Sequence, residues 1–219
     1  MNIPVRAYQG ASAEERIEER KQRLLDTAFA VMAADEWKTL SITQLCQLAG
    51  LNKRYFYESF DSLDALAEAV IENLTQQVIS LAIGTATAGT QDKLDNLALA
   101  HSVMQAVLTF LLDDPNRARV LFGERSDGSI ARSQRRKVIR TLSEAVSAYG
   151  QVFYAADQRA APFAALVSSM LIGGTVEAIL DWLDGDIRLS RKQFIHSMAA
   201  LWNLTGDAAA DLASGKNIS

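Results

Sequence analysis

The stretch SITQLCQLAGLNKRYFYESF, residues 41–60, has the pattern of two short helices joined by a tight turn. Its first half carries Ile42, Leu45 and Ala49 at three- and four-residue steps, which places one apolar side of a helix against a core. Gly50 follows directly, and glycine is the residue best suited to the positive φ that ends a helix in a turn. The pattern therefore predicts a first short helix that stops at this glycine.

The second half of the stretch predicts another short helix, set at an angle to the first. Leu51 supplies an apolar plug for the turn, and Asn52 supplies a helix cap. Phe56 and Phe60 lie four residues apart and form a buried seam. Two short helices locked in this way form a helix-turn-helix, whose second helix can enter the major groove of DNA.

The outer side of this second helix carries cations and phenols. Lys53, Arg54, Tyr55 and Tyr57 lie near its start or on its outer side, where they suit contacts with phosphates and base edges. Periodicity alone leaves one alternative open, because an ordinary helical corner with exposed charges has the same pattern.

The composition is that of a globular protein. The 219 residues are 49% hydrophobic and 22% charged, and their formal net charge is −4. Because the chain is acidic overall, any DNA contact must come from a local surface. The single cysteine, Cys46, excludes an intramolecular disulfide, and its small-residue position favours burial over redox sensing.

The sequence predicts a soluble cytoplasmic protein without a membrane partner. Residues 1–12 contain no apolar core of a signal peptide. The longest uncharged run, residues 160–176, is shorter than the roughly 20 apolar residues that a membrane helix needs.

Helical signals continue over most of the chain, so we expect an all-α fold. Capping boxes begin at Ser12, Ser41 and Ser190. Asp114 and Pro115 match the cap and first residue of another helix. No segment shows the sustained period-two alternation of an exposed strand.

The expected organisation is two domains and a tail. A helix-turn-helix domain occupies residues 1–61, with a flexible arm at 1–12. A helical effector-binding and dimerisation domain occupies residues 62–206, and a disordered tail occupies residues 207–219. The helices expected beyond residue 60 are 62–82, 92–112, 115–122, 130–156, 159–184 and 190–206, with a loop at 84–90 and a break at 123–128.

The segment TQLCQLAGLNKRYFYESFDSLDAL, residues 43–66, resembles the N-terminal domain of the tetracycline-repressor (TetR) family of transcription regulators. The shared features are an alanine-glycine turn, an apolar and then a capping residue, an aromatic-tyrosine pair and a closing phenylalanine. The resemblance, which covers about residues 15–70, implies a dimeric regulator, in most cases a repressor, that a small molecule releases from DNA. The DNA-binding residues expected at matching or neighbouring positions are Ser41, Thr43, Asn52, Lys53, Arg54, Tyr55 and Tyr57.

Two residues depart from the family's pattern, and a third places a negative charge on the expected DNA side. Leu63 stands where the family often has a phosphate-binding lysine, and Arg54 stands where it often has glycine. Glu58 faces the expected DNA side and would repel phosphate unless it pairs with Arg54 or reads a cytosine amino group.

The expected helix at 159–184 is apolar on two faces, which indicates a helix shared between a core and a partner. The resemblance implies that it joins the last helix in an intermolecular four-helix bundle, so that two recognition helices face a pseudo-palindromic operator. The alternative is a monomer whose own core uses these residues. The expected dimer-interface residues are Phe163, Val167, Met170, Gly173, Gly174 and Trp202.

The resemblance also implies a pocket for an unknown small-molecule effector between the middle helices, whose occupation pivots the fourth helix. His101 and Glu177 each interrupt an apolar stripe, so each needs a hydrogen-bond partner, which can be a ligand, water or protein. The expected ligand-binding residues are His101, Gln105, Phe110, Phe153 and Glu177, with Phe122 as a further pocket or core residue.

Other functional classes have little support. Two histidines and one cysteine without metal-ligand spacing, glycine-rich phosphate loop or nucleophile elbow argue against an enzyme, a metal site or a cofactor. The cluster Arg132, Arg135, Arg136, Lys137 and Arg140 is interpreted as a solvated face. The remaining alternative is an all-helical small-molecule-binding protein without specific DNA binding.

Overall fold

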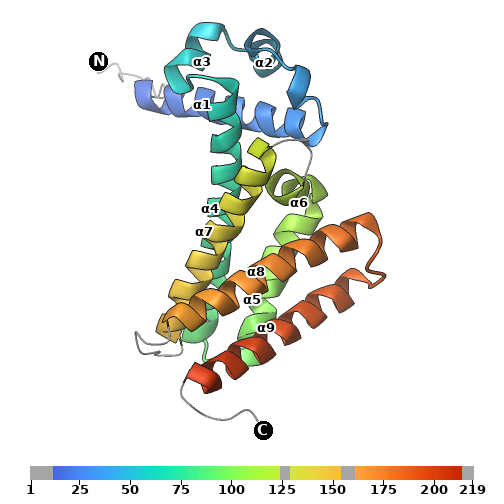
Figure 1. The fold of residues 1–219 in the computed structure, drawn as a ribbon. Coiled ribbons are helices and arrows are strands. Elements are labelled where there is room, and N and C mark those ends of the chain that lie inside the picture. Colours follow the sequence, from blue (N-terminus) through green and yellow to red (C-terminus); the bar gives the residue numbers. More distant parts are fainter. Residues whose placement is uncertain (1–11, 124–128, 154–160, 214–219) are drawn as a thin grey trace, which may run out of the picture. The chain divides into compact units, whose positions relative to one another are not determined.

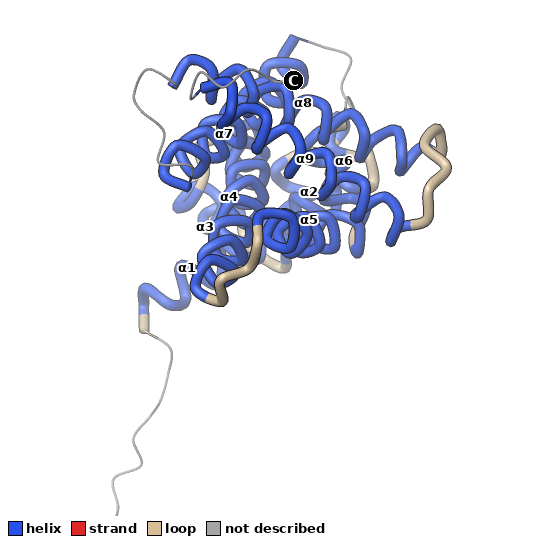
Figure 2. Tube along the Cα trace, turned by 90° about the horizontal axis from the view of Figure 1, so that it is seen from below, coloured by secondary structure: helices blue, strands red, loops and turns tan. Residues whose placement is uncertain are grey.

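The fold was examined in a computed structural model, which describes residues 12–123, 129–153 and 161–213 (Figure 1). Every regular element within these ranges is helical, and no strand occurs in them (Figure 2). The predicted all-α fold is therefore confirmed. The chain divides into two compact units, Met1–Val70 and Ile71–Ser219, which we call unit 1 and unit 2.

Unit 1 contains three α-helices, a short 3-10 helix and the start of a fourth α-helix. Its core is formed by side chains with no exposed surface, including Leu24, Leu45, Phe56 and Leu66. Leu66 belongs to the fourth helix, which explains why the unit extends beyond the predicted boundary at residue 61. The elements are α1 (Ala13–Ala33), η1 (Trp37–Thr39), α2 (Ile42–Ala49), α3 (Lys53–Ser59) and the first turns of α4 (Leu63–Gln91).

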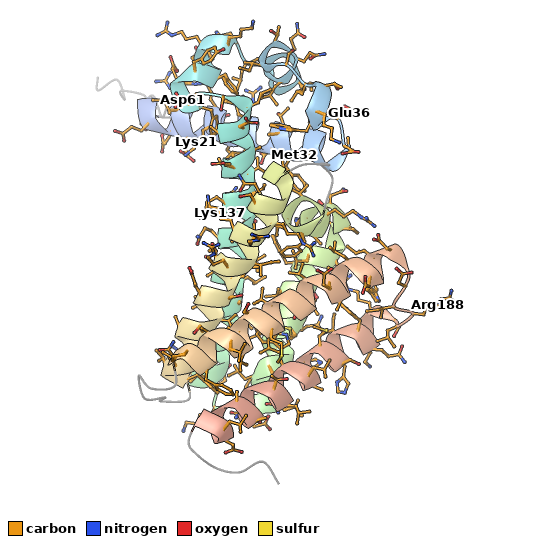
Figure 3. All side chains as sticks on the ribbon, viewed as in Figure 1. Lys21, Met32, Glu36, Asp61, Lys137 and Arg188 are labelled. Carbon is orange, nitrogen blue, oxygen red and sulfur yellow. The ribbon has the colours of Figure 1, made fainter. Side chains whose placement is uncertain are left out.

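Among its described residues, unit 2 continues α4 and adds five helices. Within it, α5 packs mainly on α9 and α7 mainly on α8, while α8 and α9 form a hairpin (Figure 1). Gly185, with φ +88°, lies at the turn of this hairpin, and the exposed Arg188 extends from it into solvent (Figure 3). The added helices are α5 (Asn96–Asp113), α6 (Pro115–Phe122), α7 (Ser129–Phe153), α8 (Ala161–Asp184) and α9 (Arg191–Ala213).

The predicted caps are present. Ser12 and Glu15 form a complete capping box at the start of α1. Asp114 accepts a hydrogen bond from the Asn116 amide at 3.1 Å, and Pro115 occupies the first turn of α6. These positions confirm that local polar residues mark where the helices begin.

The predicted loop at residues 84–90 is wrong, because α4 continues to Gln91. The hydroxyl groups of Thr85 and Thr90 donate to carbonyls one turn earlier, at 2.8 Å and 2.9 Å, so the threonines are satisfied within the helix. A Cβ on Gly89 would lie 2.6 Å from Leu99 Cδ1. This glycine therefore permits close packing and does not break the helix.

The structure describes part of the predicted C-terminal tail and only the last residue of the predicted N-terminal arm. The tail expected from residue 207 is wrong over its first part, because α9 continues to Ala213. Asp207 accepts a hydrogen bond from Asn96 Nδ2 at 2.9 Å, which ties this part of α9 to the start of α5. Residues 214–219, the arm at 1–11, most of the break at 123–128 and the predicted helix ends at 154–156 and 159–160 lie outside the described residues.

Two helices, α5 and α8, are long and apolar enough to cross a bilayer by length and composition. The sequence expectation considered only the uncharged run at 160–176 and did not identify them. Core helices of globular proteins meet the same two criteria. In this structure both helices contribute apolar side chains to a cavity inside unit 2.

Candidate functional site

The turn between α2 and α3 has the geometry that the sequence predicts. Gly50 adopts φ +64° and ψ +34°, the left-handed conformation that closes α2. The amide of Leu51 donates to the Cys46 carbonyl at 2.8 Å. A Cβ on Gly50 would lie 2.9 Å from the Nη2 atom of Arg23 in α1, the far end of a flexible side chain, so the positive φ is the main reason for glycine here.

Both short helices begin at the predicted caps. Ser41 and Gln44 form a reciprocal capping box, in which the Ser41 amide donates to Gln44 Oε1 at 2.9 Å. Asn52 Oδ1 accepts from the Tyr55 amide at 3.2 Å. The cap uses the Oδ1 atom of Asn52 and does not involve its Nδ2 group.

Two arginines of α1 that the sequence reasoning missed hold the helix-turn-helix together. Arg23 Nη2 donates to the Ala49 carbonyl at 2.7 Å, which satisfies an end group of α2. The guanidinium of Arg20 lies 4.4 Å from the centre of the Tyr55 ring and 3.9 Å from a Glu58 oxygen. Their three-residue spacing on one helix face was a possible signal.

The predicted contact residues mostly lie on the exposed side of α2 and α3. Lys53, Arg54 and Tyr57 are exposed, as are Ser41, Thr43 and Asn52. Tyr55 is half-buried, beneath the guanidinium described above. Leu48 of α2 is 64% exposed and is a further candidate for contact that the sequence reasoning missed.

Of the two alternatives that the sequence left open for Glu58, the structure shows the pairing with Arg54. Arg54 Nε lies 3.0 Å from Glu58 Oε1, and the Arg54 side chain remains 84% exposed. The negative charge of Glu58 therefore lies next to the guanidinium of Arg54 and near that of Arg20. This arrangement reduces the repulsion that Glu58 would exert on a phosphate.

Cys46 lies inside the helix-turn-helix and is 3% exposed. Burial raises the pKa of its thiol, and the nearby positive charge of Lys53 partly opposes this effect. This result favours a buried, structural role for Cys46 over redox sensing, because a raised pKa leaves little reactive thiolate at neutral pH.

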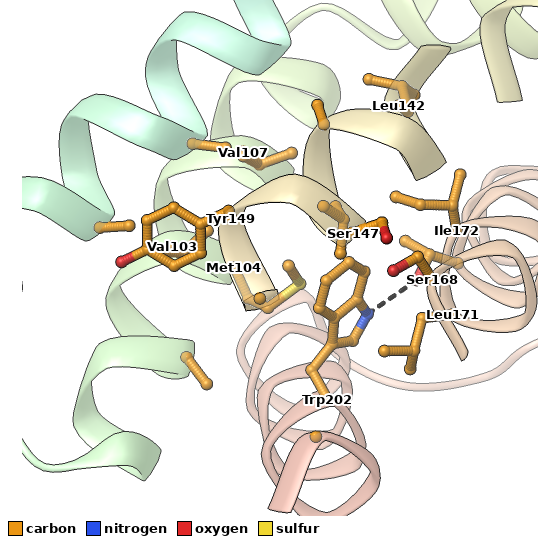
Figure 4. Close-up of a pocket in the computed structure, with 18 of the residues that line it drawn as sticks. Val103, Met104, Val107, Leu142, Ser147, Tyr149, Ser168, Leu171, Ile172 and Trp202 are labelled. Carbon is orange, nitrogen blue, oxygen red and sulfur yellow. Dashed lines mark hydrogen bonds between the residues drawn. The ribbon is translucent and has the colours of Figure 1, made fainter. Parts of the chain in front are cut away.

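Unit 2 contains a cavity of about 290 Å³, lined by residues of α4 to α9 (Figure 4). Its wall is mainly aliphatic, with Val103, Met104, Val107, Leu142 and Ile172 among the lining residues. A cavity with such a wall can bind a small apolar molecule. No group of three potential metal ligands occurs among the described residues.

Four of the five predicted ligand-binding residues do not line this cavity, and only Phe153 does so. Glu177 is corrected because its side chain is 62% exposed and pairs with Arg135 of α7. The stripe on which Glu177 lies is therefore not a buried one. Phe122, which the sequence left between pocket and core, also lines the cavity.

The three other corrected residues lie on α5 with protein partners. His101 is half-buried, and its ring centre lies 6.1 Å from that of His196. Gln105 is exposed and donates to Thr109 Oγ1 at 2.9 Å. Phe110 is covered by the Arg117 guanidinium at 4.3 Å from the ring centre. The sequence pattern placed these residues on the correct helix but could not assign which face meets the cavity.

The predicted dimer residues separate into two groups. Phe163, Val167 and Trp202 line the cavity of their own unit, so their apolar character already has an explanation. Met170 is 60% exposed and Gly174 is exposed, while Gly173 is half-buried. The remaining exposed apolar side chains of α8 and α9 include Leu166, Leu201 and Leu204, which are 64%, 55% and 68% exposed.

The basic cluster of α7 is a solvated face in part. Arg136, Lys137 and Arg140 are exposed. Arg135 differs, because its side chain is only 16% exposed and pairs with Glu177. The side chain of Arg132 lies outside the described residues.

Comparisons with known proteins identify relatives by both sequence and structure. No family model matches the chain. The nucleoid occlusion factor SlmA of two Haemophilus influenzae strains is 23% identical over 108 residues, or 49% of this chain and 48% of the relative. The chain therefore spans about half the length of the curated relatives it matches.

The solved structures cover nearly the whole chain. A TetR-family regulator from Syntrophomonas wolfei has a TM-score of 0.66 at 12% identity, covering 92% of this chain and 98% of its own. One from Streptomyces coelicolor has a TM-score of 0.62 at 18% identity, covering 92% and 90%. The fatty acid degradation regulator FadR from Bacillus halodurans has a TM-score of 0.58 at 14% identity, covering 87% and 94%. The chain thus has the fold of TetR-family transcription regulators, as the resemblance of residues 43–66 implies.

Proposed function

We propose that this chain is a dimeric TetR-like transcriptional repressor that a small molecule releases from a pseudo-palindromic operator. The observation that carries the proposal is the complete helix-turn-helix of unit 1, with the exposed cations of α3 on its outer side. It is joined in the same chain to a unit with an apolar cavity. A regulator controlled by a ligand needs both parts, whereas an enzyme would need reactive groups in the cavity.

DNA recognition is assigned to the outer side of α2 and α3. Lys53 and Arg54 bind phosphates or guanine edges, and Tyr57 donates its hydroxyl to a phosphate. Ser41 and Thr43 lie at the start of α2, where unpaired backbone amides favour an anion. The cap at Asn52 and the cation over Tyr55 make these two residues positioning groups for α3.

The dimer is assigned to the exposed apolar side chains of α8 and α9. Leu166, Met170, Leu201 and Leu204 are each more than half exposed, and a second copy of the chain would remove them from water. Gly174 has open space around its Cα, which allows a partner helix to approach closely. A two-fold dimer presents two recognition helices to a symmetric operator.

Effector control is assigned to α4. Leu66 and Val70 of this helix are buried in unit 1, whereas Val78, Ala82 and Ala86 line the cavity of unit 2. A ligand that binds one position of α4 more tightly than another shifts the population of recognition-helix arrangements. Such a regulator acts on DNA in the cytoplasm and requires neither a membrane nor a cofactor.

The test is binding of the full chain to duplex DNA of random sequence, measured by fluorescence anisotropy at several salt concentrations. A regulator should lose affinity steeply as salt rises, because phosphate contacts release counterions. Lys53→Ala should weaken binding and reduce the salt slope by about 1. The matched control is Lys137→Ala, which removes an exposed lysine of unit 2 and should leave the slope unchanged.

Selection of bound sequences from a random pool then tests the dimer and the operator. A two-fold symmetric consensus supports the proposal, and its half-site spacing reports the distance between recognition helices. Absence of salt-dependent binding would favour the second candidate, an all-helical small-molecule-binding protein without specific DNA binding. The observation in favour of that candidate is the cavity, which does not depend on unit 1.

A further inference from the structure

We infer that the cavity of unit 2 binds an uncharged, chain-like hydrocarbon with one hydrogen-bonding oxygen, and that Ser168 binds this oxygen. The inference rests on the effector cavity of the proposed function and names the class of ligand. It depends on three features of the wall: its lack of charge, a buried hydroxyl without a partner, and its length along α5.

No lysine, arginine, histidine, aspartate or glutamate is among the described residues that line the cavity. An ionised carboxylate or ammonium entering such a site would lose its hydration and gain no opposite charge in return. A carboxylic acid can enter only as its neutral form, which is scarce at neutral pH. The wall therefore selects against charged molecules.

Ser168 of α8 is 4% exposed and lines the cavity, and its hydroxyl makes no hydrogen bond to any residue that the structure describes. Other buried hydroxyls differ from it, because Thr75 and Ser143 each donate to a carbonyl one turn earlier at 2.7 Å. The Ser168 oxygen is not among the fully enclosed polar atoms that lack a partner, so it is open to the cavity. It can therefore form a hydrogen bond with an oxygen of a molecule that enters the cavity.

Ser168 is one of a minority of polar residues in a mainly apolar wall, which also include Asn96, Tyr149, Thr175 and Asn203. Ser147 of α7 also lines the cavity (Figure 4), and its hydroxyl accepts a hydrogen bond from Gln151 Nε2 at 3.2 Å. The indole of Trp202 donates to Thr175 Oγ1 at 2.9 Å, so its donor is already used. The Ser168 hydroxyl, which has no such bond, can serve one small polar group of a ligand.

The length and volume of the cavity limit the size of the ligand. Lining residues extend along α5 from Asn96 to Leu111, which corresponds to about 22 Å of helix. The volume of about 290 Å³ equals that of about ten water molecules at roughly 30 Å³ each. A chain of about ten carbons with one terminal oxygen matches this volume, and it is shorter than the span along α5.

The experiment is isothermal titration of the full chain, without DNA, with 1-decanol and with decanoate at pH 7.5. Decanol should bind and decanoate should bind at least about 100-fold more weakly, because its carboxyl group is mainly ionised about three pH units above a pKa near 4.3. The apparent affinity for decanoate should rise about tenfold for each unit by which the pH is lowered toward that pKa.

Two serine variants test the hydrogen bond. Ser168→Ala should weaken decanol binding about 2- to 10-fold, which is the usual effect of one neutral hydrogen bond. The matched control is Ser169→Ala, which removes the exposed hydroxyl of the next residue and should leave the affinity unchanged.

The outcomes separate this inference from the proposed function. Failure of decanol to bind, or equal affinity for decanoate, overturns the ligand class. Equal effects of the two serine variants overturn the role of Ser168. None of these results alters the salt dependence of DNA binding, whereas a chain that binds decanol but not DNA keeps the inference and contradicts the regulator.

Discussion

The helix-turn-helix of unit 1 takes its defining residues from one short stretch, whereas the cavity of unit 2 takes its wall from α4 to α9. In unit 1, caps, the glycine turn and the phenylalanine seam lie within residues 41–60. In unit 2, cavity residues as distant as Val78 and Ala210 meet. The difference teaches that a site made of neighbours in sequence can be located by pattern, while a site made of distant helices cannot.

Among the changes proposed here, a substitution in the phenylalanine seam of the helix-turn-helix should lower the stability of the chain most. Phe56→Ala removes a side chain with 0% exposure and should lower the free energy of unfolding by about 3–5 kcal/mol. Urea denaturation followed by circular dichroism measures this change. The control Tyr57→Phe removes a hydroxyl from a side chain that is 58% exposed and should change stability by less than about 0.5 kcal/mol. Equal effects of the two variants would show that the seam does not hold unit 1 together.

A charged substitution on the exposed face of α8 tests whether a second copy of the chain covers this face. Met170→Asp should weaken dimerisation at least about 100-fold, equivalent to about 2.7 kcal/mol, because it places an unpaired carboxylate in an apolar contact. Sedimentation equilibrium measures the change. Val152→Asp is the matched control, since Val152 is 81% exposed on α7. An unmodified chain that is monomeric at micromolar concentration contradicts the proposed dimer.

Alanine substitutions at Gly50 and Gly84 compare a glycine that a turn requires with one that lies inside a helix. Gly50→Ala should destabilise the chain by about 1–2 kcal/mol, because alanine is strained at φ +64° and its Cβ would approach Arg23 Nη2. Gly84→Ala should stabilise it by about 0.5–1 kcal/mol, because Gly84 is within α4 and has open space at its Cβ position. Thermal denaturation measures both, and destabilisation at Gly84 would contradict a continuous α4.

The smallest expected effect is the pH dependence that arises from Cys46. Burial raises the pKa of this thiol above 9.0, so the unfolded chain loses the proton first as the pH rises. The contribution of Cys46 to stability is therefore complete below pH 9 and declines above it, by at most about 1.4 kcal/mol per pH unit.

The measurement is urea denaturation at pH 8 to 10 of the unmodified chain and of Cys46→Ala. The difference in stability between the two should narrow as the pH rises. A difference that stays constant over this range would show that the thiol titrates equally in both states.

Sequence reasoning predicted most of the fold correctly because helix starts depend on neighbouring residues. Ser12, Ser41 and Asn52 cap helices where expected, and each uses an amide two or three residues further along. The same local reasoning failed at residues 84–90. Small and polar residues there predict a loop, but contacts with Leu99 from the next helix make a glycine in α4 favourable.

The sequence identified some residues of the candidate sites and missed others. Arg54 and its partner Glu58 lie four residues apart on α3, so their pairing could be anticipated. Arg20 and Arg23 were missed because their partners lie at least 26 residues further along the chain. Ser168 was missed because serine is common in helices, and only its burial without a partner distinguishes it.

The sequence by itself determined the helical content, the caps and the helix-turn-helix, because these depend on contacts within one or two helical turns. Only the tertiary structure decided which face of α5 and α8 meets the cavity and which face is exposed. An apolar stripe predicts that its side chains are buried, but it does not identify the surface that buries them. The structure therefore places His101 and Glu177 outside the cavity wall and Ser168 and Trp202 in it.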